Sequence, residues 1–177
     1  IDDNPIIDYC KNNNINFFRG SKNNVALRFL KCATNIKLDY AIRINGDNLF
    51  TDPSIIDKMV SITKLKKWKF ITNVPDRTFP EGISVEIINV SLMKREINNF
   101  NHFEQEHVMP FFYKNLKEHE IFKLKNMKFS NSTKIKLALD TKKDLENFTK
   151  VFEIMDKPPS LYKTNEVINI IKNLKII

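Results

Sequence analysis

Two aspartates stand where a metal ion could be bound, each shortly after a segment with the pattern of a β-strand. Asp47 follows residues 38–44, and Asp140 follows residues 134–139. In α/β sheets, ligands bind at the carboxyl ends of strands. Two carboxylates at that edge could share one Mg²⁺, with substrate phosphate oxygens and water completing the octahedron. The residue types also allow a second interpretation, in which Asp47 is a turn residue and Asp140 belongs to a helix cap.

The glycines of the chain favour a site beside Asp47. The sequence contains 3 glycines, in the segments FRGS, INGD and PEGIS, whereas average usage would give about a dozen. A chain this sparing of glycine is expected to keep it where φ is positive or where a ligand comes close. Gly20 and Gly46 follow predicted strands and lie beside Arg19, Ser21 and Asp47. For each glycine alone, a tight turn remains the alternative.

Alternating helical and strand patterns predict an α/β fold with helices packed on a mainly parallel sheet. Helical periodicity is expected over residues 3–13, 23–35, 53–65, 91–99, 104–116, 141–155 and 166–174, and strands over 15–18, 38–44, 68–74, 84–90, 121–125 and 134–139. Asp52 and Thr141 are the expected N-caps of two of these helices, with Asp144 completing an approximate capping box. The inward faces are expected to be formed by Val25, Phe29 and Cys32, by Ile56, Met59 and Val60, and by Leu145, Phe148, Phe152 and Met155.

Length and composition indicate a single domain over residues 1–177. Hydrophobic residues make up 42% of the 177 residues, and no apolar run is long enough to span a membrane. The net charge of +8 comes from scattered basic residues, which favours ordinary solvated positions over a nucleic-acid surface. Cys10 and Cys32 show no metal-binding spacing, so two buried, reduced thiols in a cytoplasmic protein are expected.

Five segments occur in an order that resembles a known family. They are FFRGSKNNVALRF, AIRINGDNLFTDP, RTFPEGISVEI, EQEHVMPFF and KLALDTKKDLE, which lie within residues 1 to about 155. This order resembles cytidylyltransferase-like proteins of surface polysaccharide biosynthesis, of the spore-coat polysaccharide and flagellin-glycosylation type. These are relatives of the CMP-sialic acid and CMP-Kdo synthetases. The resemblance implies a three-layer α/β/α, Rossmann-like nucleotide-diphospho-sugar transferase fold (glycosyltransferase-A-like) with a mostly parallel sheet.

The resemblance also implies an activity and roles for particular residues. A hydroxyl of a sugar, expected to be a nonulosonic or related acid sugar, would attack the α-phosphate of CTP and release pyrophosphate. The implied Mg²⁺ ligands are Asp47 and Asp140, and no protein nucleophile is required. The implied nucleotide-binding residues are Arg19, Gly20, Ser21 and Asn24, and the implied sugar-binding residues are Arg43, Asn45, Glu86 and His107. A homodimer remains open, as do purely structural roles for Arg43, as a strand residue reaching the surface, and for His107, as a packed helix residue.

The family pattern opens with a strand and a basic loop for which this sequence shows no counterpart before its first residue, Ile1. We therefore expect residues 1–177 to lack a central strand together with the triphosphate-binding loop. By itself this stretch is expected to be inactive and poorly stable, whereas the full-length protein is expected to be a Mg²⁺-dependent enzyme. The alternative is a non-catalytic remnant, or a nucleotide- or sugar-binding module, of the same fold.

Overall fold

A four-stranded mixed sheet forms the centre of the protein, with the strands in the order β1-β3-β2-β4. A computed structural model describes residues 3–126 and 135–176. The strands are β1 (Tyr40–Arg43), β2 (Phe70–Thr72), β3 (Glu86–Asn89) and β4 (Ile121–Lys123). The α/β class predicted from the sequence is therefore confirmed.

The expectation of a mostly parallel sheet is wrong. β3 lies between β1 and β2 and pairs antiparallel with each of them, while β2 and β4 pair in parallel. Parallel neighbours need a crossover connection, usually a helix. Residues 73–85, which join β2 to β3, contain the short 3₁₀ helix η1 (Pro75–Arg77) and no α-helix that could cross the sheet. The chain therefore reverses direction and returns beside β2.

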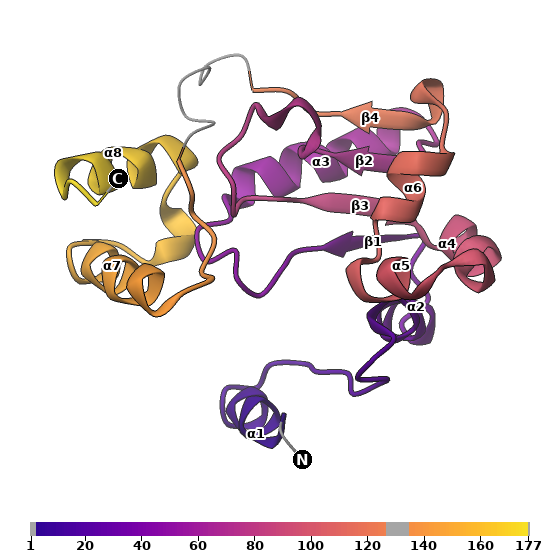
Figure 1. The fold of residues 1–177 in the computed structure, drawn as a ribbon, viewed down its shortest axis with the longest axis horizontal. Coiled ribbons are helices and arrows are strands. Elements are labelled where there is room, and N and C mark those ends of the chain that lie inside the picture. Colours follow the sequence, from indigo (N-terminus) through magenta and orange to yellow (C-terminus); the bar gives the residue numbers. More distant parts are fainter. Residues whose placement is uncertain (1–2, 127–134, 177) are drawn as a thin grey trace.

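Helices cover the sheet and extend past one of its ends (Figure 1). The α-helices are α1 (Asn4–Asn12), α2 (Val25–Asn35), α3 (Pro53–Leu65), α4 (Val90–Glu96), α5 (His102–His107), α6 (Pro110–Asn115), α7 (Lys142–Glu153) and α8 (Thr164–Asn173), with the 3₁₀ helices η2 (Ile97–Asn99), η3 (Glu118–Glu120) and η5 (Pro159–Leu161). Across the described ranges, none of these helices has the length and apolar character needed to cross a membrane.

The two faces of the sheet are covered by different helices, because successive side chains of a strand point to opposite faces. Phe70 and Ile88 belong to one buried cluster with residues of α2, α4 and α6. Their chain neighbours Ile71 and Ile87 belong to another, with residues of α3. The sheet is thus enclosed between two helical layers, as the resemblance implied.

A third cluster lies past the end of the sheet, where α7 and α8 pack together (Figure 1). Its aromatic centre is Phe50, whose ring makes an edge contact with Phe148 at 5.0 Å and stacks on Phe152 at 5.1 Å between centroids. Ile83 and Leu137 belong to the same cluster. The segments that flank the two candidate aspartates are therefore anchored in one apolar core.

Three predicted elements differ from the structure. Residues 15–18 form no strand, and Ile15 and Phe17 are about half exposed, since no described strand lies beside them to complete their hydrogen bonds. Within 134–139, residue 134 lies outside the described ranges, and Lys136 forms an isolated bridge with Glu81. The helix expected over 104–116 is divided at Val108, whose φ is 69°.

The expected inward faces are only partly buried. In α7, Phe148 and Val151 are buried, whereas Leu145 is 54% exposed. In α2 the buried residues are Ala26, Leu30 and Ala33, and in α3 they are Ile55, Met59 and Ile62. Each apolar stripe is wider than the surface that meets the core, so the helical period alone does not select the buried side. The cysteines are free and half-buried rather than buried.

The carboxylate of Asp52 caps two helices at once. Its Oδ1 accepts from the backbone N–H of Ser54 at 2.9 Å, at the start of α3. Its Oδ2 accepts from the backbone N–H of Thr164 at 2.9 Å, at the start of α8. Burial raises the pKa of Asp52, but hydrogen bonds from Ser54 and Thr164 outweigh burial and hold the pKa below its usual value near 3.8. This residue therefore joins the C-terminal helices to the body of the sheet.

We predict that Asp52→Ala lowers the free energy of unfolding by about 2–4 kcal/mol, because two caps of about 1–2 kcal/mol each are lost. The exposed Asp57 of the same helix provides the control, and Asp57→Ala should change stability by less than about 0.5 kcal/mol. Because the folded pKa of Asp52 lies below the unfolded one, its contribution is present above pH 4 or so and disappears at lower pH. Urea unfolding of both variants at pH 7 and pH 3 measures this, and equal losses at the two pH values would contradict it.

Candidate active site

Two cavities meet at Asp47, just after the carboxyl end of β1. The smaller has a volume of about 180 Å³, and the larger has a volume of about 620 Å³. The smaller cavity is lined in part by Asn45, Asp47, Asn48, Asn73, Arg77 and Asp140. The larger is lined in part by Phe18, Arg43, Asn45, Gly46, Asp47 and His107. Five of the ten residues singled out from the sequence thus line these two cavities, and Asp140 is one of the five.

Asp47 has an unusual environment for a carboxylate. Its Oδ1 is buried and has no hydrogen-bond partner among the described residues. A buried polar oxygen without a partner is costly, and native structures contain few of them. The backbone carbonyl of Asp47 accepts from the N–H of Leu139 at 3.0 Å, which holds it beside the segment leading to Asp140. Both carboxylates line the smaller cavity, so the pair chosen by spacing is brought to one place.

The donor set of the smaller cavity fits a magnesium ion that is shared with a substrate. In the described part of the chain, no group of three or more His, Cys, Asp or Glu side chains is arranged to hold a metal. Mg²⁺ does not require such a group, since it is usually bound by one or two carboxylates together with phosphate oxygens and water. The unpaired Oδ1 of Asp47 and the carboxylate of Asp140 meet that requirement.

Lys136 is the counter-ion of Asp140. Its Nζ lies 2.7 Å from Oδ2 of Asp140 and 3.1 Å from Oδ2 of Asp144. These two carboxylates, that of Asp140 foremost, raise the pKa of Lys136. The four-residue spacing of Lys136 and Asp140 was visible in the sequence, but our sequence analysis did not use it.

The helix that follows Asp140 is capped by other side chains. Thr141 and Asp144 form the capping box of α7, as predicted. The backbone N–H of Asp140 donates to Asp144 at 3.0 Å, and this bond is the main cause that lowers the pKa of Asp144 to about 2. The carboxylate of Asp140 is therefore not the cap of α7, and it points instead to Lys136 and the cavity.

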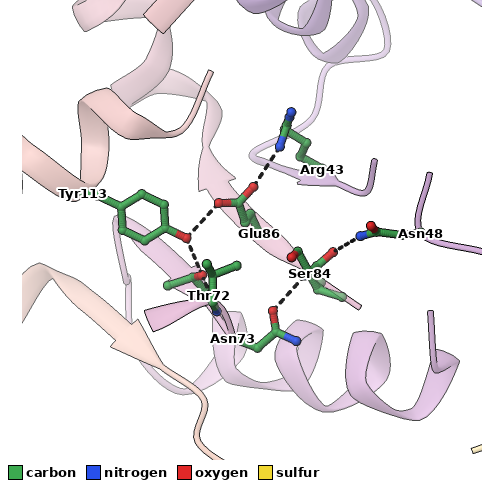
Figure 2. Close-up of polar contacts among 9 residues, drawn as sticks. Arg43, Asn48, Thr72, Asn73, Ser84, Glu86 and Tyr113 are labelled. Carbon is green, nitrogen blue, oxygen red and sulfur yellow. Dashed lines mark hydrogen bonds and ion pairs between the residues drawn. The ribbon is translucent and has the colours of Figure 1, made fainter. Parts of the chain in front are cut away.

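Two asparagines hold the backbone around Ser84, which lines the smaller cavity. The side-chain amide of the buried Asn73 donates to the carbonyl of Ile83 and accepts from the N–H of Val85, each at 2.8 Å. The side chain of Asn48 donates to the carbonyl of Ser84 at 3.2 Å (Figure 2). Together with the backbone hydrogen bond from Asn73 to Val85, these contacts fix the chain just before β3 begins, where Ile83 and Ser84 line the same cavity as Asp47.

Gly82 and Gly46 are glycines for different reasons. Gly82 has φ = 92°, and a Cβ there would lie 2.2 Å from the backbone nitrogen of Ala138. Its absence of a side chain lets the loop approach the segment before Asp140. Gly46 has open space, because a Cβ would meet nothing within 4 Å. Packing among the described residues does not require a glycine there, and Gly46 lines the larger cavity.

Of the residues that the resemblance assigns to the nucleotide, Arg19 and Gly20 line a neighbouring cavity of about 580 Å³, whereas Ser21 and Asn24 are not among its lining residues. Arg19 donates to the side chain of Asn4 at 3.0 Å. Asn24 is the N-cap of α2, and its backbone N–H donates to Ser21 Oγ at 3.0 Å. Arg28, which our sequence analysis missed, lines both this cavity and the larger one at Asp47.

Of the residues assigned to the sugar, Arg43, Asn45 and His107 line the larger cavity. Glu86 is not among its lining residues and is 5% exposed. Its carboxylate accepts from Arg43 at 3.0 Å and from the hydroxyl of Tyr113 at 2.7 Å (Figure 2). Burial raises the pKa of Glu86, and burial together with the charge of Glu86 raises the pKa of Tyr113. No pattern in the sequence identified Tyr113, which lies in α6.

The fold and the site define an α/β protein with two carboxylates at one cavity beyond the end of β1. Within that class the chain belongs to the cytidylyltransferase family, whose family model matches residues 2–172. A solved structure of a cytidylyltransferase from Leptospira borgpetersenii superimposes with a TM-score of 0.89 at 28% identity. The match covers 99% of this chain and 74% of that one. The family resemblance of the five motifs is therefore confirmed.

Two relatives show similarity over most of this chain. The spore coat polysaccharide biosynthesis protein SpsF of Bacillus subtilis is 27% identical over 158 residues, which cover 86% of this chain and 63% of SpsF. The uncharacterized protein MJ1063 of Methanocaldococcus jannaschii is 25% identical over 179 residues, which cover 93% of this chain and 72% of MJ1063. The chain thus spans less than two thirds of SpsF.

We predict that two glycine substitutions differ in their effect on stability. Gly46→Ala should leave the free energy of unfolding within about 0.5 kcal/mol of the wild type, because the added methyl group meets open space. Gly82→Ala should cost more than about 2 kcal/mol, because it adds a positive-φ strain and a clash with backbone. Thermal melting of the two variants measures the difference. A destabilised Gly46→Ala protein would show that this position has a structural role instead.

Proposed function

We propose that the protein transfers CMP from CTP to a hydroxyl of an acid sugar, such as a nonulosonic acid, and releases pyrophosphate. The CMP-sugar would serve the synthesis of a surface glycan or the glycosylation of flagellin. Membership of the cytidylyltransferase family supports the reaction class, and the name of SpsF supports a role in polysaccharide synthesis. The observation that carries the proposal is the unpaired, buried Oδ1 of Asp47 in the same cavity as Asp140.

Asp47 and Asp140 are the residues that would hold Mg²⁺. When bound, the ion supplies neutralisation of charge on the α-phosphate and the leaving pyrophosphate. Lys136 also lies 3.1 Å from the carboxylate of Asp144. It would therefore still have an anionic partner if Asp140 bound the ion. Arg77 lines the same cavity and is a further cation that would interact with the phosphates of CTP.

The remaining residues bind and orient the two substrates. Arg43 is suited to an anionic group of the sugar, because a guanidinium recognises carboxylates through paired hydrogen bonds. Asn45 lines both cavities and can bond to either substrate. Holding the sugar hydroxyl in line with the α-phosphate supplies much of the rate enhancement expected for such a transfer.

We predict that the full-length protein releases pyrophosphate from CTP when Mg²⁺ and a suitable sugar acid are both present. The test compares CTP with ATP and UTP, against a panel that includes N-acetylneuraminic acid and 3-deoxy-manno-octulosonic acid. Pyrophosphate is measured by a coupled assay, and the CMP-sugar by mass spectrometry. Equal turnover of ATP or UTP, or no turnover with any sugar acid, would contradict the proposal and favour a non-catalytic binding module.

We further predict that Asp47→Asn and Asp140→Asn each lower kcat by about 100-fold or more, because a metal that stabilises transition-state charge is lost. Each variant should melt near the wild-type temperature. The double variant should be scarcely worse than either single one, because both changes affect one ion.

Binding of Mn²⁺ in the presence of CTP, measured by electron paramagnetic resonance, gives a readout that does not depend on turnover. Both aspartate variants should bind Mn²⁺ at least about tenfold more weakly, and the control Asp57→Asn should bind it normally. A fully active Asp47→Asn enzyme would leave Asp47 as a turn residue, since asparagine serves turns as well as aspartate does.

A further inference from the structure

A polar row crosses three strands of the sheet at the edge of the candidate site. Arg43 of β1 lies opposite Glu86 of β3, and Glu86 lies opposite Thr72 of β2. Two residues further along the strands, the same face carries the apolar residues Ala41, Ile88 and Phe70, which belong to the core under α2, α4 and α6. The polar row is therefore a continuation of an apolar core, in a position where apolar residues would pack without any cost of burial.

Hydrogen bonds connect the polar residues of this row, and each bond is donated toward Glu86. The backbone N–H of Val74 donates to Thr72 Oγ1 at 3.1 Å. Thr72 and Tyr113 share a hydrogen bond of 2.6 Å between their hydroxyls. Because the single proton of Tyr113 is donated to Glu86 Oε1 at 2.7 Å, Thr72 must be the donor to Tyr113. The chain of donors thus ends on the Glu86 carboxylate (Figure 2).

The other oxygen of that carboxylate holds Arg43. Arg43 Nη1 donates to Glu86 Oε2 at 3.0 Å, and the side chain of Arg43 is 21% exposed while that of Glu86 is 7% exposed. Arg43 lines the larger cavity, and Glu86 does not. A ligand in this cavity can therefore contact the guanidinium, whereas Glu86 and Tyr113 act on such a ligand through Arg43. A buried charge retained in this way is expensive, which points to a function for its geometry.

We propose that Glu86 and Tyr113 are positioning residues, which fix the Arg43 guanidinium at the cavity wall so that its remaining N–H groups face an anionic group of the sugar substrate. The proposal rests on the proposed function and adds to it the residues that orient the guanidinium. Arg43 donates to Glu86 through Nη1. Because a guanidinium has five N–H donors in a rigid fork, most of its donors are not used by this contact. Fixing one edge of the fork leaves the other edge oriented for bidentate binding.

The first test measures the order of the Arg43 side chain without reference to activity. In ¹⁵N-labelled full-length protein, the Nε–H signal of Arg43 is assigned by its loss in Arg43→Lys. Tyr113→Phe keeps the ring, which contacts Phe70 at 4.9 Å between centroids, and removes the hydroxyl. The order parameter of the Arg43 Nε–H should fall to below about 0.6, a value typical of flexible groups. Glu86→Gln provides a second variant with the same expected result, should Tyr113→Phe fail to fold.

Tyr162→Phe is the matched control. Tyr162 is also buried, and its hydroxyl donates to the carboxylate of Asp156 at 2.6 Å, in the cluster of α7 and α8. This variant loses the same chemical group from a similar partner at a distance from the cavity. It should leave the order parameter of Arg43 and the kinetic constants unchanged.

The second test separates positioning from general damage. With the sugar acid that the wild type turns over best, Tyr113→Phe should raise KM for the sugar about tenfold, as expected for one lost hydrogen bond to a charged group. KM for CTP and kcat should change by less than about twofold. In an Arg43→Gln background, Tyr113→Phe should have no further effect on KM for the sugar, because it acts through a residue already removed.

The outcomes distinguish this proposal from the proposed function. Unchanged order of Arg43 in both Tyr113→Phe and Glu86→Gln overturns the positioning role, whatever the enzyme's activity. Additive effects of Tyr113→Phe and Arg43→Gln on KM for the sugar also overturn it. Absence of CTP-dependent pyrophosphate release with every sugar acid overturns the proposed function, and the order parameter of Arg43 then still decides whether Glu86 and Tyr113 fix the guanidinium.

Discussion

The pairing of β3 with both β1 and β2 is the interaction on which the rest of the structure depends. Its register sets Glu86 opposite Arg43 and Thr72, and it sends Ile87 and Ile88 into different cores. A slip of one residue would turn every side chain of β3 to the other face. Glu86 would then face the apolar layer of α3, and an isoleucine would stand beside the Arg43 guanidinium. The two cores and the polar row therefore reinforce the same register.

Local signals in the sequence were sufficient where a local interaction decides the structure. Asp52 and Thr141 were predicted as N-caps because a cap needs one side chain and the next turn of backbone, and both predictions are confirmed. The direction of β3 was not predictable in this way, since it depends on the partners of the strand and on the path of residues 73–85. Residues 15–18 have the composition of a strand, but a strand also requires a neighbour with which to pair.

The residues of the candidate site also differ in whether a local signal in the sequence predicted them. The sequence analysis expected Asp47 and Asp140 to lie together, and both line one cavity. The segment before Asp140, however, forms an isolated bridge with Glu81 and not the predicted strand. The hydrogen bonds of Tyr113 and Asn73 could not be predicted, since their partners are distant in sequence. Lys136 is an intermediate case. Its spacing from Asp140 was visible, but lysine is common throughout this chain and the composition concealed the one that pairs with a candidate ligand.

The wide apolar stripe of α2 explains how one helix serves both the core and the site. Ala26 and Leu30 are buried in the core, whereas Val25 and Phe29, which were expected to face inward, are half-buried and line the larger cavity. Ligand cavities are usually mostly apolar, with a few polar groups that fix orientation. Here α2 provides the apolar wall, and Arg43, fixed from behind by the Glu86 carboxylate, provides a charged group on the wall formed by the end of β1. With Arg43 fixed as we propose, such a cavity would select a ligand by the position of its charge relative to its apolar face, which a flexible arginine on the surface would not do.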